Sequence, residues 1–117
     1  MRILIVDLEY LVAMEAERIL GDAFQCDIQI AMPHEYPAVL ENQTFDIVLI
    51  DSGLARKPEG ADDLRAAGVG VVFSTFLDEE LAGLADWPGV AVVPKPFDEE
   101  QLTDAVGNAA RDRATLP

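Results

Sequence analysis

The stretch Phe45-Asp46-Ile47-Val48-Leu49-Ile50-Asp51-Ser52-Gly53 decides the fold. Its first six residues are apolar with one exception, and the run then stops at a carboxylate followed by residues typical of a turn. A short apolar run of this kind predicts a strand that is buried on both faces, and such strands are typical of parallel sheets. Parallel sheets bind their ligands just beyond the carboxyl ends of the strands, which is where Asp51 is expected to stand.

The alternation of apolar strands with helical segments continues along the chain. We expect the other strands at residues 3–6, 26–31, 69–74 and 90–93. Helices are expected at residues 8–20 (stopped by Gly21), about 33–41, 61–67, 78–85 and from 98 onward, with a loop at 52–60. This order predicts an α/β fold, in which a five-stranded parallel sheet carries helices on both faces through right-handed crossovers. The alternating pattern at residues 26–31 places the second strand at an edge.

The composition and net charge argue against some classes of binding partner. The chain has 117 residues, expected to form one domain over 1–117, and a net charge of -14 from 22 acidic and 8 basic residues. Such a charge argues against direct nucleic-acid binding, which needs clustered Lys and Arg. It suits a divalent cation or a basic protein surface, or simply keeps the protein in solution.

The sequence also indicates the cellular compartment in which the protein acts. No segment approaches the roughly 20 apolar residues of a membrane helix, so no membrane insertion is expected. The N-terminus becomes charged too early for a signal peptide. The single cysteine, Cys26, fits a reducing compartment. A cytoplasmic protein is therefore expected.

Polar side chains follow four of the predicted strands. Asp7 follows the first and Asp51 the third, Ser74 and Thr75 end the fourth, and Lys95 follows the fifth. These groups would meet at one edge of a parallel sheet, where carboxylates suit Mg²⁺ and the hydroxyl and ammonium suit a phosphoryl group. The simpler alternatives are that Asp51 only caps its strand and that Lys95 is a solvated surface residue.

Four segments together resemble the receiver domain of bacterial two-component response regulators, the CheY-like family. They are Ile3-Leu4-Ile5-Val6-Asp7, the strand ending at Asp51, Val71-Val72-Phe73-Ser74-Thr75, and Lys95-Pro96-Phe97. The resemblance covers nearly the whole chain and depends on the order and spacing of the segments. It implies a flavodoxin-like, doubly wound sheet with strand order 2-1-3-4-5.

The resemblance also implies a role for each residue. Asp51 would accept a phosphoryl group from a histidine kinase or a phosphotransfer protein, with Mg²⁺ required. Thr75 would hydrogen-bond the phosphoryl oxygen and Lys95 would pair with it. Asp7 and Asp51 would bind the metal, and the backbone carbonyl of Gly53 would be a further ligand. Thr75 is preferred to Ser74 because Val71-Val72-Phe73 match the apolar part of the strand.

The sequence departs from the family pattern near these residues. Leu8 stands where receivers usually carry a second acidic residue, so magnesium binding is expected to be weak. Phe76 replaces a small residue beside the hydroxyl, and its ring would cover the pocket or hinder a partner. Val92 replaces the usual aromatic switch residue, and Leu54-Ala55 lacks the usual proline.

Three functions follow. The first is a stand-alone, non-enzymatic receiver in a phosphorelay, with Asp51 as phosphoacceptor and output through an unidentified protein partner, because no output domain is expected after the last helix. The second is a pseudo-receiver that binds a partner without phosphorylation, since Leu8 and Phe76 disable phosphotransfer. The third is a small phosphatase or phosphotransferase with Asp51 as nucleophile. A chain of 117 residues leaves no substrate domain for it. A homodimer is left open.

Overall fold

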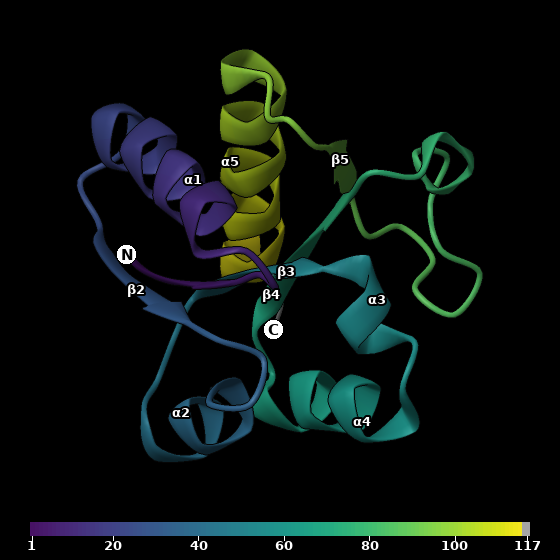
Figure 1. Ribbon diagram of the computed structural model, residues 1–117. Helices are drawn as coiled ribbons and strands as arrows, with labels where there is room; N and C mark the ends of the chain where they lie inside the picture. The colour runs from purple at the N-terminus through teal and green to yellow at the C-terminus, as the bar shows by residue number, and fades with distance from the viewer. Residues whose placement is uncertain (116–117) are drawn as a thin grey trace.

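A five-stranded, wholly parallel sheet forms the middle of the molecule (Figure 1). Its spatial order is β2-β1-β3-β4-β5. The strands are β1 (Arg2–Val6), β2 (Asp27–Ala31), β3 (Ile47–Asp51), β4 (Gly70–Thr75) and β5 (Val92–Pro94). The structure is a computed structural model that describes the backbone of residues 1–115 and the side chains of residues 1–112. It confirms the predicted flavodoxin-like fold and the edge position of β2.

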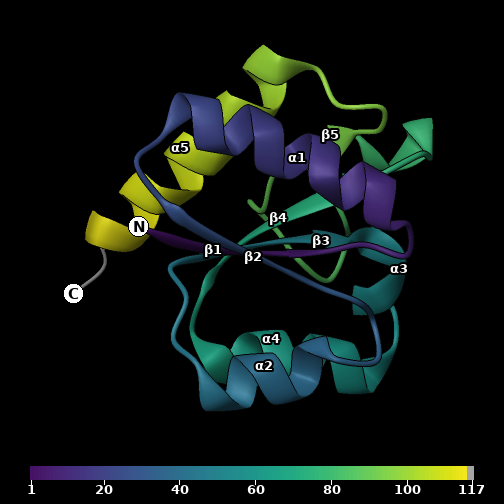
Figure 2. The ribbon, with the colours of Figure 1, turned by 60° about the vertical axis from the view of Figure 1, so that its left-hand side comes forward.

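Helices cover both faces of the sheet. Helices α1 (Tyr10–Ala23) and α5 (Glu99–Thr115) lie on one face, and α2 (Tyr36–Asn42) and α4 (Pro58–Ala67) lie on the other, as Figure 2 shows with the sheet nearly edge-on. The short helix α3 (Ser52–Ala55) directly follows β3. Among residues 1–115, none of the helices is long and apolar enough to cross a membrane.

The central strand β3 is apolar from Ile47 to Ile50 because it contributes to two cores. Ile47 and Leu49 pack with residues of α1 and α5, whereas Val48 and Ile50 pack with residues of α2 and α4. Successive side chains of a strand point to opposite faces, so a strand covered on both faces needs apolar residues at every position. Asp51, the last residue of β3, is the first residue of this strand that is not buried.

The predicted loop at residues 52–60 is wrong. The segment contains α3 and the first turn of α4. The two glycines that indicated a loop serve close packing instead: a Cβ atom on Gly60 would lie 2.2 Å from the carbonyl oxygen of Leu54. A Cβ on Gly53 would lie 2.9 Å from the carboxylate of Asp51.

The predicted helix at residues 78–85 is also wrong. Only a single 3₁₀ turn, η1 (Asp78–Glu80), forms there, and the chain then turns at Gly83, whose φ is 115°. A residue in this left-handed region cannot continue a right-handed helix. The segment that joins β4 to β5 is therefore mostly irregular, and it extends beyond the carboxyl ends of the strands (Figure 1).

Gly21 does not stop the first helix, which continues to Ala23. It lies on the exposed side of α1 and does not have a positive φ, and a Cβ atom there would meet nothing within 4 Å. By contrast, Gly68 follows the last residue of α4 in the left-handed conformation, with φ 64°, so this helix ends at residue 67 as predicted.

These two glycines should respond oppositely to alanine. Gly21→Ala is expected to raise the free energy of unfolding by about 0.4–1 kcal/mol, because alanine lowers the entropy of the unfolded chain and fits the helix. Gly68→Ala is expected to lower it by about 1–2 kcal/mol, because the left-handed conformation is strained for alanine. Urea denaturation of both variants measures the pair, and equal signs would contradict the assignment of the two helix ends.

Candidate functional site

The ammonium group of Lys95 lies between two carboxylates at the carboxyl ends of the strands. Its Nζ is 2.7 Å from Asp51 Oδ2 and 3.0 Å from Asp7 Oδ2. Lys95 and Asp7 are almost sealed from solvent, with side chains 2% and 4% exposed, whereas the side chain of Asp51 is 14% exposed. The structure thus brings together three of the predicted site residues and leaves Asp51 as the accessible carboxylate.

Backbone geometry holds each member of this triad. Asp7 directly follows β1, and its Oδ1 accepts from the backbone N–H of Glu9 at 2.9 Å. Asp51 ends β3, and its Oδ1 accepts from the backbone N–H of Gly53 at 2.8 Å. Lys95 follows β5, and its N–H donates to the carbonyl oxygen of Thr75 at 2.8 Å. Each group is therefore fixed by the end of a strand.

Electrostatics keep Lys95 charged. Burial alone would lower the pKa of its ammonium group, but hydrogen bonds and charge interactions with Asp51 and Asp7 outweigh burial and raise the pKa above its ordinary value. The ring of Phe76 adds a cation–π contact, with its centroid 4.6 Å from Nζ. The ring that sequence analysis expected to cover the pocket lies over this lysine and is itself 59% exposed.

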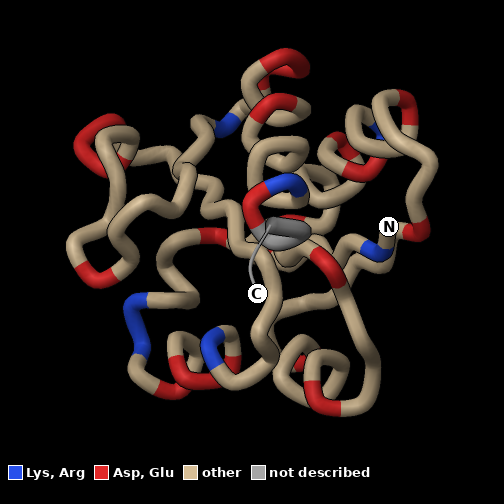
Figure 3. Tube along the Cα trace, turned by 180° about the vertical axis from the view of Figure 1, so that it is seen from behind, with Lys and Arg blue, Asp and Glu red and all other residues tan. Residues whose placement is uncertain are grey.

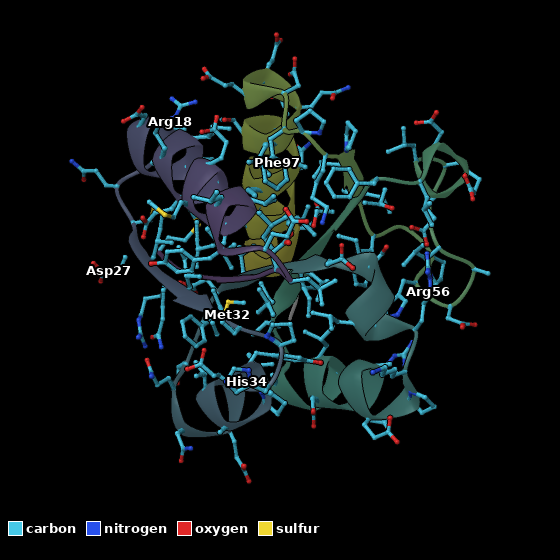
Figure 4. All side chains as sticks on the ribbon, in the orientation of Figure 1. Arg18, Asp27, Met32, His34, Arg56 and Phe97 are labelled. Carbon is cyan, nitrogen blue, oxygen red and sulfur yellow. The ribbon has the colours of Figure 1, made fainter. Side chains whose placement is uncertain are left out.

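The hydroxyl of Thr75 has a partner that the sequence did not reveal. Thr75 ends β4 and is 2% exposed, and its Oγ1 donates to Glu80 Oε1 at 2.5 Å. The same oxygen of Glu80 accepts from Ser52 Oγ at 2.8 Å, and Oε2 pairs with the guanidinium of Arg56. Figure 4 shows the labelled Arg56 beside the segment that joins β4 to β5.

Glu80 is ionised in this setting. Burial would raise the pKa of its carboxyl, but the hydrogen bonds from Thr75, Arg56 and Ser52 outweigh burial and lower the pKa below its ordinary value. Glu80 is buried, while its acidic neighbours Asp78 and Glu79 are exposed. The burial of Glu80 could not be predicted from the sequence, because nothing in the acidic run 78–80 indicates which side chain turns inward.

The donor set does not make a complete magnesium site. Both carboxylates already accept from Lys95, and Leu8, at the position of the missing acid, is 60% exposed. Over the side chains described, no three His, Cys, Asp or Glu residues are placed to hold a metal ion together. The backbone N–H of Gly53 faces Asp51, so the predicted ligand role of its carbonyl stays a prediction. Mg²⁺ is usually held by one or two carboxylates together with water, and here the ammonium of Lys95 already contacts Oδ2 of both Asp7 and Asp51.

Acidic residues surround this site and the rest of the molecule. Figure 3 shows Asp and Glu on elements all over the fold, with few Lys and Arg between them. A cavity of about 590 Å³ lies at the amino ends of β4 and β5, where they pack beside α5. Asp51 lies away from it, at the carboxyl end of β3.

Lys95→Met should destabilise the protein strongly. Removing the ammonium leaves two carboxylates facing each other, one of them buried, and the free energy of unfolding is expected to fall by about 3–5 kcal/mol at pH 7. The exposed Lys57→Met is the matched control, with an effect within about 0.5 kcal/mol.

The pH dependence has a definite sign. Because folding raises the pKa of Lys95, its contribution is complete below about pH 10.4, where free lysine titrates, and is lost as the pH rises through the folded value. The difference between wild type and Lys95→Met should therefore shrink at alkaline pH. Denaturation curves that show equal stability at pH 7 would contradict this account.

Known proteins with a similar structure share one fold. The chain superposes on a response regulator receiver protein from Sinorhizobium medicae with a TM-score of 0.78 and 22% identity, covering 96% of this chain and 95% of that one. The PhyR receiver domain of Erythrobacter litoralis superposes with a TM-score of 0.75 and 23% identity, covering 99% of this chain and 94% of that one. A receiver domain protein from Clostridium thermocellum superposes with a TM-score of 0.74 and 22% identity, covering 99% of this chain and 98% of that one.

Sequence comparison adds nothing to these structural matches. No protein-family model and no curated protein matches the sequence. The TM-scores of 0.74 to 0.78 over nearly the whole chain, together with the observed strand order, establish the fold. The chain therefore has the receiver-domain fold of response regulators.

Proposed function

We propose that this chain is a receiver that accepts a phosphoryl group on Asp51 within a phosphorelay. One observation carries the proposal: the accessible carboxylate of Asp51 stands 2.7 Å from an ammonium group that the buried Asp7 holds in place. In this receiver fold the group lies at the carboxyl end of the central strand, where chemistry is expected in an open parallel sheet.

The triad suits nucleophilic attack on phosphorus. A carboxylate oxygen of Asp51 would form the new P–O bond of an acyl phosphate, while the bond to the donor breaks and the donor leaves as an imidazole or an acetate. The phosphoryl oxygens gain negative charge during transfer, and the Lys95 ammonium lies within reach to stabilise it. Asp7 keeps that ammonium charged and oriented.

Partners follow from this chemistry. The donor would be a histidine kinase or a phosphotransfer protein, and output would pass through contact with a second protein. Within this proposal the chain catalyses no turnover beyond its own phosphorylation and acts in the cytoplasm. The acidic surface favours a partner that presents positive charge.

Phosphorylation from a small donor tests the proposal. Incubation with acetyl phosphate and Mg²⁺ is expected to add one phosphoryl group, seen by intact mass and mapped to Asp51. Asp51→Asn should abolish it because the amide is not a nucleophile here, whereas Asp62→Asn, the same change at an exposed position, should not. An unmodified Asp51, even with a cognate kinase, would contradict it.

A second function, the pseudo-receiver, is favoured by the incomplete metal site. Leu8 faces solvent where an acidic residue is expected, and Lys95 contacts Oδ2 of both carboxylates. In that case the fold binds its partner without phosphorylation. Magnesium affinity separates the two functions.

Leu8→Asp should strengthen magnesium binding. A third carboxylate beside Asp7 supplies another oxygen ligand, and the dissociation constant measured by calorimetry is expected to fall about tenfold or more. Leu8→Asn, which adds a similar shape without the charge, is the control. Leu8 is exposed, so neither change should disturb the fold. Tight, Asp7-dependent binding in the wild type would instead contradict the pseudo-receiver.

A further inference from the structure

The carboxylate of Glu80 is the best-connected group near Asp51 that the proposed phosphotransfer does not use. It comes from the 3₁₀ turn η1, between β4 and β5, and is 8% exposed. It touches groups from three other places in the fold: Ser52 in α3, Arg56 after α3, and Thr75 at the end of β4.

Counting protons shows what this carboxylate does to Thr75. An ionised carboxylate only accepts hydrogen bonds, and a hydroxyl has one proton to donate. The protons of Thr75 and Ser52 must therefore both point at Glu80 Oε1. Thr75 Oγ1 also accepts from the backbone N–H of Leu77 at 3.0 Å. Thr75 thus has no proton left for another acceptor while Glu80 stays in place.

A phosphoryl group on Asp51 would create a conflict with this arrangement. It adds about -1.5 to -2 charge and three strong acceptor oxygens. Ser52 is the next residue after Asp51, and Ser74, beside Thr75, is the register partner of Asp51 in the sheet. The incoming group would therefore need the donors that Glu80 holds, and it would repel the carboxylate across a partly desolvated pocket.

We propose that Glu80 is a positioning residue that holds the Thr75 hydroxyl away from Asp51, and that phosphorylation of Asp51 displaces it. This inference depends on the phosphoacceptor function proposed above. On displacement the Thr75 proton moves from Glu80 Oε1 to a phosphoryl oxygen, and the Arg56 guanidinium loses its partner. The segment 76–81 leaves with Glu80, and it carries Phe76, Leu77 and Leu81, which are 59%, 41% and 40% exposed.

Glu80→Gln tests the proposal with Glu79→Gln as its matched control. Both remove one negative charge at neighbouring positions, but only Glu80 is buried against Thr75. The initial rate of Asp51 phosphorylation by acetyl phosphate should rise about tenfold in Glu80→Gln, the size of a barrier change near 1.4 kcal/mol. It should be unchanged in Glu79→Gln.

Thr75→Val separates positioning from a general structural effect. If Glu80 acts through the Thr75 hydroxyl, adding Glu80→Gln to Thr75→Val should give less than half of the acceleration seen in the wild-type background. The same acceleration in both backgrounds would overturn the positioning role. Far-UV circular dichroism of each variant verifies that the fold is kept.

Amide hydrogen exchange gives a readout that needs no phosphotransfer. In unphosphorylated Glu80→Gln, residues 76–82 should exchange faster than in Glu79→Gln, while α4 is unchanged. Unchanged exchange there would overturn the restraint.

The outcomes also separate this inference from the function. Wild type that is phosphorylated as fast as Glu80→Gln overturns the inference and leaves the function standing. Phosphorylation of Glu80→Gln alone supports the inference, and failure of both proteins overturns both proposals.

Discussion

One buried ammonium group holds the carboxyl ends of three strands together. Lys95 joins Asp7 and Asp51, and so connects the ends of β1, β3 and β5, which are far apart in sequence. Neither carboxylate would be stable so close to the other without that charge. The strand order β2-β1-β3-β4-β5 and the crossovers are what deliver the three groups to one place.

Much of this could be predicted from sequence because the relevant signals are local. Ile3 to Val6 and Ile47 to Ile50 are apolar at every position, which only a strand covered on both faces requires. Asp7, Asp51 and Lys95 each come immediately after a strand, so a parallel sheet brings them to one edge. Their convergence follows from topology alone.

The rest depends on contacts between distant residues, which no local pattern encodes. Glu80 lies in a run of three acidic residues. It is the buried one because its carboxylate binds Ser52, Thr75 and Arg56, which lie outside that run. Gly60 is typical of a loop in the sequence. In the structure it is a glycine because α4 packs against the backbone of α3 there and leaves no room for a Cβ atom. The helix expected at 78–85 gives way to an irregular segment that delivers Glu80 to the pocket.

Because β5 is short, its pairing with β4 stabilises the carboxyl end of β4 and leaves the amino end of β4 without a strand partner on that side. β5 pairs with β4 only from Phe73 to Thr75, next to the Lys95 triad, and the beginning of β4 has no β5 partner where the cavity lies. Local opening should therefore start at that far corner, where few backbone hydrogen bonds must break. Fraying there would leave the contacts of Lys95 with Asp7 and Asp51 intact, so the protein can be marginally stable at one end of the sheet while the charged triad at the other end stays assembled.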